Sequence, residues 1–304
     1  MLHLGLDIGG TKMEAVLLNA SGDCVYRQRR PTHKESYDAF MLQLTRLIDD
    51  VRDWSERPFS LGIGLPGAVD PQSGLIKNCN CLVLNGQDLR RDLTQRLGQP
   101  VWMANDADCF TLSEAVDGAG AGAHTVFGVI IGTGCGGGIA VNQQLLSGPN
   151  AIVGEWGHNP LPGYTPERDG PAQPCYCGKE NCIESFLSGT GFARRYGEAA
   201  RAETIIQAAQ EGDARAQAHW QHFIDAFARS LASVINILDP QVIVLGGGLS
   251  NVEQLYEDLP DAIVPYLFSD GCRTQIKPAR FGDASGVRGA AWLPVLANAG
   301  DRSR

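Results

Sequence analysis

The sequence lacks any apolar run long enough to cross a membrane, since no stretch of about eighteen consecutive apolar residues occurs in it. Basic side chains are also few, because 25 Lys and Arg stand against 34 Asp and Glu and leave a net charge of −9. Nucleic-acid binding normally needs a basic face that releases phosphate counterions, so we expect no nucleic-acid partner and no membrane partner. The N-terminus lacks the features of a secretory signal, and we expect a soluble, cytoplasmic protein.

The length limits the possible folds. At 304 residues the chain exceeds the size at which a single core stops growing, about 250 to 300 residues, so we expect two domains with a cleft between them. The nine cysteines do not indicate disulfides, because their number is odd and no export signal points to an oxidising compartment. We expect six of them to be small, partly buried side chains: Cys24, Cys79, Cys81, Cys109, Cys135 and Cys272.

The other three cysteines form a cluster with metal-ligand spacing. Cys175, Cys177 and Cys182 lie within eight residues, and His158 precedes them. A Cys₃His set is typical of structural zinc, which it binds tetrahedrally with no position left open for a substrate. We therefore predict a zinc site at these four residues, with two carboxylates, Glu155 and Glu184, beside it. A zinc hydrolase, which would need an open position with a bound water, is a less favoured alternative.

Apolar patterns predict a strand, a glycine-rich turn and a returning strand at the start of each half of the chain. In the first half we expect strands at 2–6, 13–18, 24–29, 60–65 and 101–103, and helices at 36–51 and 109–116. In the second half we expect strands at 124–131, 139–142 and 241–245 and a helix at 214–238, after a flexible linker at 118–122. This predicts a duplicated α/β fold with domains 1–118 and 119–285.

Glycine-rich turns are the candidates for phosphate binding, because backbone amides there can approach an anion closely. They are Asp7-Ile8-Gly9-Gly10-Thr11-Lys12, Gly132-Thr133-Gly134 and Gly246-Gly247-Gly248. Each alone is more often an ordinary turn, but the three together favour a nucleotide. They match neither a Walker A loop nor a dinucleotide fingerprint, since the first turn joins two strands and opens no helix.

Asn105-Asp106 follows a predicted strand, where a general base for a substrate hydroxyl could lie. Asp106 could equally cap the helix expected to begin near Cys109, and the residues alone leave both roles open.

These motifs resemble the ROK family of sugar kinases and repressors, over nearly the whole chain. Asp7 to Lys12 is similar to the family's first phosphate motif, Asn105-Asp106 to its catalytic pair and Gly132 to Gly138 to its second phosphate motif. Gly154-Glu155-Trp156-Gly157-His158 resembles the sugar-binding element. Cys175 to Glu184 resembles the zinc signature, with Asn181 where a glycine is usual; Asn tolerates the left-handed conformation that such a glycine serves.

The resemblance implies the two-domain fold of actin-like and hexokinase-like ATPases, built from duplicated ribonuclease-H-like domains, with a C-terminal helix at 286–304 that completes the first domain. It implies that Asp106 is the base, with ATP, Mg²⁺ and structural Zn²⁺ as cofactors. Asp7, through Mg²⁺, and the glycine turns would hold the ATP phosphates and Gly246 to Gly248 the nucleoside. The sugar would be bound by Asn105, Glu155, Glu184 and the second ring nitrogen of His158, with Gly67 and Asn80 as weaker additions.

The amino-acid sequences of segments 114–118, 154–162 and 174–192 resemble those of bacterial fructokinases of the family, some of which also phosphorylate mannose. This favours phosphorylation of D-fructose to fructose 6-phosphate. N-acetylglucosamine kinase or glucokinase is the alternative. A sugar-responsive repressor is remote, because such members carry a helix-turn-helix before the first phosphate motif, and here only Met1 to Leu6 precede Asp7. Homodimers are common in the family, so a homodimer is possible here by analogy.

Overall fold

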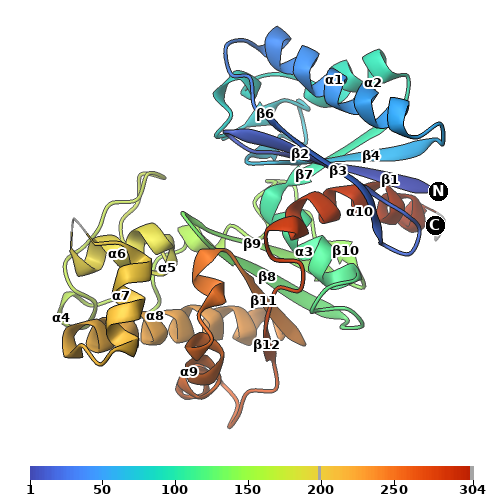
Figure 1. Cartoon of the computed structure of the whole chain (residues 1–304). Coiled ribbons are helices and arrows are strands. Elements are labelled where there is room, and N and C mark those ends of the chain that lie inside the picture. The colour runs from blue at the N-terminus through green and yellow to red at the C-terminus, as the bar shows by residue number, and fades with distance from the viewer. Residues whose placement is uncertain (198–199, 302–304) are drawn as a thin grey trace.

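The computed structural model describes residues 1–197 and 200–301 and contains two five-stranded sheets (Figure 1). The first sheet has the order β3-β2-β1-β4-β7. Its first three strands in sequence form an antiparallel meander, and β4 and β7 run parallel to β1. These strands are β1 (Leu2–Ile8), β2 (Lys12–Leu18), β3 (Cys24–Pro31), β4 (Phe59–Leu65) and β7 (Val101–Asn105).

The second sheet repeats this topology, with the order β10-β9-β8-β11-β12 and the same strand directions. Its strands are β8 (Thr125–Ile131), β9 (Cys135–Val141), β10 (Gln144–Leu145), β11 (Val242–Gly246) and β12 (Gln275–Pro278). The duplication is confirmed, and the architecture is the two-domain actin-like ATPase fold. The division near residue 118 stays a proposal, and residues 302–304 of the expected C-terminal helix lie outside the described residues.

Helices cover both faces of each sheet (Figure 1). On the first sheet, α1 (Tyr37–Trp54) and α2 (Leu89–Leu97) lie on one face and α10 (Ser285–Asp301) on the other. On the second, α3 (Asp106–Val116) lies opposite α8 (Ala214–Leu238) and α9 (Gln254–Ile263). The smaller elements are β5 (Ala68–Val69), β6 (Ile76–Lys77), α4 (Pro166–Asp169), α5 (Glu184–Leu187), α6 (Gly189–Tyr196), α7 (Ala202–Gln210) and short 3-10 turns that include Trp156–His158.

The helices α3 and α10 cross between the two sheets (Figure 1). Glycine allows this close crossing, since a Cβ on Gly289 of α10 would lie 1.7 Å from the carbonyl oxygen of Cys109 in α3. On the opposite side of α10, a Cβ on Gly62 of β4 would lie 1.9 Å from the carbonyl oxygen of Ala290. The start of α3 is thereby held between the two domains.

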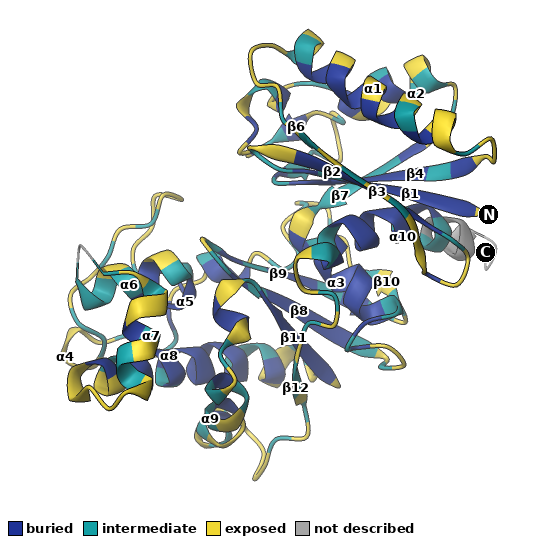
Figure 2. Ribbon diagram, in the orientation of Figure 1, coloured by how far each residue is buried: buried dark blue, intermediate teal, exposed yellow. Residues whose placement is uncertain are grey.

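Each domain has its own hydrophobic core, and Figure 2 shows the buried strands and helix faces that form it. In the first, β1 and β4 pack against α1, whose apolar residues Phe40, Leu44 and Ile48 are fully buried. In the second, β8 and β11 pack against α8 and α9. No described helix is long and apolar enough to span a membrane.

Three sequence expectations need correction. Helix α3 begins at Asp106 and not near Cys109, because the Asn105 side chain accepts a hydrogen bond from the Ala107 amide and caps it. Strand β9 begins at Cys135 and not at Ile139, so only Gly132 to Gly134 form the turn. The segment 118–122, expected to be a flexible linker, is packed against α3, where the Glu114 carboxylate accepts a hydrogen bond from the Ala119 amide.

Candidate active site

Asn105 and Asp106 stand where β7 ends and α3 begins, between the two sheets. The Asn105 amide has two bonds, its oxygen to the Ala107 amide at 2.8 Å and its nitrogen to the Gly67 carbonyl oxygen at 3.3 Å. Asn105 therefore caps α3 and fixes the loop that holds Gly67. Asp106 is the first residue of the helix and is classed as exposed, and one oxygen of its carboxylate accepts a hydrogen bond from the Ala107 amide at 2.9 Å. The second carboxylate oxygen is available to a substrate.

Carboxylates from both domains converge near Asp106. Removal of water by the surrounding protein raises the pKa of Asp106, and the negative charge of Glu155 raises it further. Burial raises the pKa of Asp7, at the end of β1, to about 6, and the charge of Asp106 adds to the effect. Burial raises the pKa of Asp108 to about 7, with Asp106 and Glu155 as the next causes. Such crowding of acidic groups favours proton uptake or cation binding.

The predicted phosphate turn of the first domain is a tight β1–β2 hairpin. The Gly9 amide donates to the Lys12 carbonyl oxygen at 2.9 Å, and the Thr32 hydroxyl donates to the Gly9 carbonyl oxygen at 2.8 Å. The Lys34 ammonium lies 4.0 Å from the position that a Cβ on Gly10 would take. Thr11 and Lys12 are exposed, so the turn offers a hydroxyl and an ammonium group to the solvent, and the ammonium group of Lys34 lies near Gly10.

The two glycine turns of the second domain meet each other. Gly247 has a left-handed φ of 85°, and its Cα lies 4.0 Å from the position of a Cβ on Gly132. The Gly132 carbonyl oxygen accepts a hydrogen bond from the Gly189 amide at 2.7 Å, which ties the turn to the start of α6. Thr133 and Gly248 are exposed at this junction. Within the described ranges, no hydrogen bond joins these turns to the Gly9–Lys12 turn.

Glu184 lies directly against the second turn. Its carboxylate accepts a hydrogen bond from the Cys135 amide at 2.9 Å and would lie 2.9 Å from a Cβ on Gly134. Glu155 is brought to the same region by Trp156, whose buried indole donates to the Gly136 carbonyl oxygen at 3.0 Å. Glu184 therefore lies against the turn, while the bond from Trp156 holds the segment that contains Glu155 against β9.

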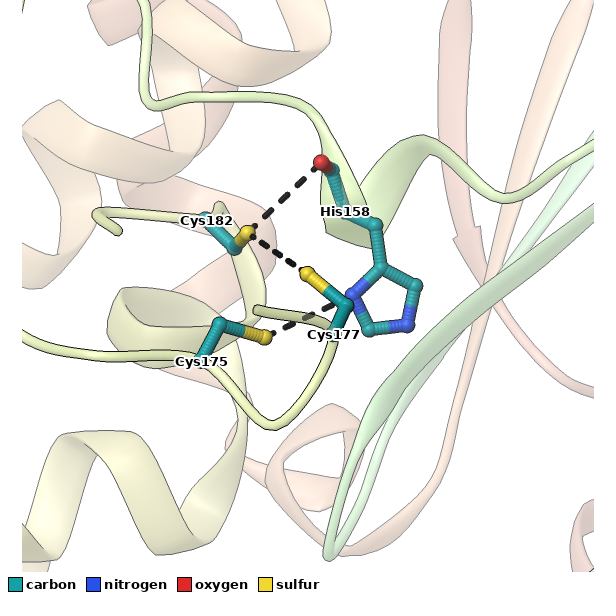
Figure 3. Close-up of side chains that lie close together, drawn as sticks. All are labelled: His158, Cys175, Cys177 and Cys182. Atoms are coloured by element: carbon teal, nitrogen blue, oxygen red, sulfur yellow. Dashed lines mark hydrogen bonds between the residues drawn. The ribbon is translucent and has the colours of Figure 1, made fainter. Parts of the chain in front are cut away.

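The predicted metal ligands are close together (Figure 3). The ligand atoms of His158, Cys175, Cys177 and Cys182 all lie within 4.8 Å of one another. The Cys175 sulfur is 3.6 Å from His158 Nδ1, and the Cys177 and Cys182 sulfurs are 3.6 Å apart. Zinc–sulfur bonds of about 2.3 Å give a tetrahedron with edges of about 3.8 Å, so the donor set and its spacing fit zinc.

Asn181 closes the metal loop. Its φ is 54°, as expected for a residue that stands in place of a glycine. Its side-chain oxygen also accepts a hydrogen bond from the Gln173 amide at 2.9 Å, and its amide donates to the Gln173 carbonyl oxygen at 2.9 Å. Asn181 thus adopts the left-handed conformation that a glycine would adopt, and in addition makes a side-chain hydrogen bond that glycine could not make.

The second ring nitrogen of His158, which the resemblance assigns to the sugar, has a neighbour within the protein. Nε2 lies 2.9 Å from the Tyr176 hydroxyl, and the two rings meet edge to face with their centroids 5.1 Å apart. Burial raises the pKa of Tyr176 to about 12, and the charges of Glu184 and Glu155 add to it. Tyr176 therefore contacts the candidate metal ligand His158 through both its hydroxyl and its ring.

The weaker candidates, Gly67 and Asn80, join the same site from the first domain. The backbone amide of Asn80 donates to the Pro66 carbonyl oxygen at 3.0 Å. The next carbonyl oxygen, that of Gly67, accepts the hydrogen bond from the Asn105 side chain. A side chain at Gly67 would collide with Cys79, 2.7 Å away. Sequence reasoning missed Lys34, Asp108 and Tyr176. Only Tyr176 had a signal, as an aromatic residue between two metal ligands.

Comparison with known proteins identifies the family. The profile described as "ROK family" matches residues 3–295. The N-acetyl-D-glucosamine kinase of Pasteurella multocida is 40% identical over 301 residues, which cover 96% of this chain and 99% of that protein. The ROK hexokinase of Thermus thermophilus, 28% identical, has a TM-score of 0.88 and matches 99% of this chain and 100% of its own.

A ROK family glucokinase from Streptomyces griseus, solved with glucose and AMPPNP, is 25% identical with a TM-score of 0.75. The match covers 96% of this chain and 99% of that chain. The motifs, the duplicated topology and these relatives agree. The chain belongs to the ROK family.

Proposed function

We propose that this protein is an ATP-dependent hexose kinase. The observation that carries the proposal is that Asp106 begins α3 where this helix packs on β9, next to the strand residue that binds Glu184. A Cβ on Gly136 of β9 would lie 3.4 Å from the Ala107 Cβ, and the amide of the neighbouring Cys135 donates to the Glu184 carboxylate at 2.9 Å. A sugar offers several hydroxyls that donate to carboxylates, while a glycine turn suits phosphate. A site that combines both fits phosphoryl transfer from ATP to a sugar hydroxyl.

Asp106 acts as the general base in this proposal. It accepts the proton of the sugar hydroxyl as that oxygen attacks the γ-phosphorus, and ADP leaves on the opposite side. Its raised pKa makes it a better proton acceptor than an ordinary aspartate. Asn105 keeps Asp106 in place through its bonds to α3 and to the Gly67 loop.

Asp7 and the glycine turns serve the nucleotide. Asp7 is a largely enclosed carboxylate beside another negative group, an environment that a divalent cation such as Mg²⁺ would relieve. The turns at Gly9–Lys12 and Gly132–Gly134 hold the ATP phosphates, and Gly246–Gly248 lies against the nucleoside.

Zinc, held by His158, Cys175, Cys177 and Cys182, would supply rigidity and no open coordination position. Glu155 lies just before the ligand His158 and Glu184 just after the ligand Cys182. The metal loop would therefore fix the two segments that carry these carboxylates. The proposed cytoplasmic location accords with such an activity on small metabolites.

N-acetyl-D-glucosamine is the favoured sugar, because relatives that match nearly the whole chain at 38–40% identity are named N-acetyl-D-glucosamine kinases. The fructokinase subtype expected from the sequences of segments 154–162 and 174–192 has no support from these relatives, so D-fructose, with D-mannose, is the second candidate. Both sugars have a primary hydroxyl on C6, which Asp106 would activate.

A coupled assay of ADP formation tests the proposal. Purified protein is supplied with MgATP and, separately, N-acetyl-D-glucosamine, D-fructose, D-mannose and D-glucose. We expect sugar-dependent ADP formation with at least one of them, and the highest kcat/KM identifies the substrate. ADP formation that does not depend on any of the four sugars would contradict the proposal.

A further inference from the structure

The turn between β1 and β2 is open on the side of Gly10, and a cation from another segment lies there. A Cβ on Gly10 would lie 4.0 Å from the Lys34 ammonium and, apart from its chain neighbours, would have no other described atom within that distance. A Cβ on Gly9 would instead collide with the Lys12 carbonyl oxygen, 2.9 Å away. The open side of this turn therefore faces a positive charge.

Two backbone donors of the turn are unused in the part of the chain that the structure describes. The Gly9 amide donates to the Lys12 carbonyl oxygen, but the amides of Gly10 and Thr11 donate to no acceptor among the described residues. Amide donors beside an ammonium group suit an anion with several acceptor oxygens, such as a phosphoryl group. The turn and Lys34 together provide these donors.

The segment that carries Lys34 is tied both to the turn and to α1. The Thr32 amide donates to the Thr11 carbonyl oxygen at 3.0 Å, and the His33 amide donates to the Gln43 side chain at 2.9 Å. Gln43 lies on α1 and is buried. Lys34 therefore extends from a backbone whose position relative to the turn is fixed, although its own side chain is exposed.

The charge of Lys34 is available to a bound anion. The arginines of the preceding strand are ion-paired, Arg27 and Arg29 with Glu14 and Arg30 with Asp50. No carboxylate of the described residues lies within ion-pair distance of the Lys34 ammonium. A bound anion would therefore meet a cation that no protein group neutralises.

Three segments leave the first sheet at the same edge. Strands β1 and β4 run parallel, with Asp7 opposite Gly64, so the turn after β1 and the Gly67 loop after β4 begin at the same edge. Strand β3 also ends there, because its last residue, Pro31, pairs with Lys12 at the start of β2. The segment after β3 therefore lies at the edge that carries both the phosphate turn and the proposed sugar loop.

The charge of Lys34 also acts on the sugar loop. Burial raises the pKa of Cys81, next to the candidate Asn80, and the positive charge of Lys34 opposes this rise. The phosphoryl group that lies between the phosphate turn and the sugar is the one that is transferred, the γ-phosphoryl group of ATP.

We propose that Lys34 is a phosphate-binding residue, whose ammonium group binds the γ-phosphoryl group of ATP above the Gly10 side of the turn. There it neutralises part of the negative charge of this group during transfer. The inference rests on the proposed function and adds to it a residue that lies outside the glycine-rich motifs.

Lys34→Met tests the inference, because it removes the charge and keeps most of the side-chain length. Calorimetry without sugar uses two probes, MgAMPPNP, which has a γ-phosphoryl group, and MgADP, which lacks one. The Kd of AMPPNP should rise about tenfold in the variant, as for loss of a charged hydrogen bond, and the Kd of ADP should stay within about twofold. The kcat/KM for ATP should fall by at least the same factor as AMPPNP affinity, and the sugar Kd should stay within about twofold.

Two matched variants separate the contact from the general charge of the surface. Lys34→Arg keeps the charge and should bind AMPPNP within about threefold of the wild type. Glu35→Gln changes the charge of the adjacent side chain, which is 73% exposed, by one unit and leaves the ammonium group in place. Because salt screens an exposed charge, its AMPPNP Kd should stay within about twofold of the wild-type value.

The outcomes distinguish this inference from the proposed function. If the wild type phosphorylates no sugar of the panel, the proposed function fails and this inference with it. If the wild type is active and Lys34→Met binds AMPPNP as tightly as the wild type, the inference alone fails. An equal loss of AMPPNP and ADP affinity, or a loss of sugar affinity, would also overturn it, because Lys34 would then act on the turn or the fold and not on the γ-phosphoryl group.

Discussion

The substitution Asn181→Ala separates two contributions to the zinc loop. Alanine loses the bond from the Gln173 amide, worth about 1 kcal/mol, and must adopt a φ of 54°, which costs about 1 to 2 kcal/mol. The expected loss is about 2 to 3 kcal/mol. Asn181→Gly loses the bond and avoids the backbone cost, so its expected loss is about 1 kcal/mol.

Zinc binding reports these losses, because metal binding is coupled to formation of the loop. About 1.4 kcal/mol is a factor of ten, so apparent zinc affinity should fall about 30- to 150-fold in Asn181→Ala and about fivefold in Asn181→Gly. The assay is competition with a chromogenic chelator at pH 7.5.

Asn142→Ala is the matched control, because Asn142 also has a positive φ, 51°, but lies in the β9–β10 turn. Its zinc affinity should equal that of the wild type. Equal zinc affinities of Asn181→Ala and Asn181→Gly would refute the left-handed cost, and wild-type affinity in both would refute the coupling of this hydrogen bond to the metal.

Three further predictions concern the carboxylates and the helix crossing. The pKa of Asp7 is about 6 in the folded chain against an ordinary 3.8, so between these pH values the folded state binds a proton that the unfolded state does not. The free energy of unfolding without ligand should therefore fall as pH rises from about 4 to 6. The Mg²⁺ concentration for half-maximal rate should rise below about pH 6, because protonated Asp7 binds the cation less well. Asp7→Asn should need the same Mg²⁺ concentration from pH 5 to 8. The same pH independence in the wild type would contradict the role of Asp7 in cation binding. Glu155→Gln removes a charge that raises the pKa of Asp106, so the acid limb of kcat/KM should move to lower pH; a limb that stays in place or moves up would disprove the coupling. Gly289→Ala places a Cβ 1.7 Å from the Cys109 carbonyl oxygen and should destabilise the fold by about 1 to 3 kcal/mol in thermal unfolding. Gly286→Ala is the control, because its Cβ would lie 3.8 Å from the nearest atom, an Asp7 carboxylate oxygen, and should leave stability unchanged. Equal melting temperatures of the two variants would show that α10 can shift to accommodate the Cβ.

The sequence predicts the regular parts of the fold because their patterns are local. In the β1–β2 hairpin and in α8, apolar residues recur at the spacing that burial of the element requires, and both elements have nearly the expected bounds. Strand β9 escapes such reasoning. Its glycines have low strand propensity, yet side chains at Gly137 and Gly138 would collide with Trp156 and Thr111, so tertiary packing selects them.

The site shows the same division. Motif spacing predicts the metal ligands, and the structure confirms that they lie close together. Cys175, Cys177 and Cys182 share one short loop, so their closeness depends little on the rest of the fold, whereas His158 is brought to them from a separate turn. The partner of His158 Nε2 could not be predicted, since it depends on how the Tyr176 ring folds back over the loop. Nor could the raised pKa of Asp108, which arises from enclosure by the protein and from Asp106 and Glu155.

The role of Asp106 is the central claim, and Asp106→Asn tests it most directly when turnover and sugar binding are measured on the same preparation. Asparagine keeps the size of the side chain and cannot accept the hydroxyl proton as a base. The account predicts that kcat falls about 10²- to 10⁴-fold while the calorimetric sugar Kd changes by less than about threefold. Near-normal turnover in Asp106→Asn would contradict it.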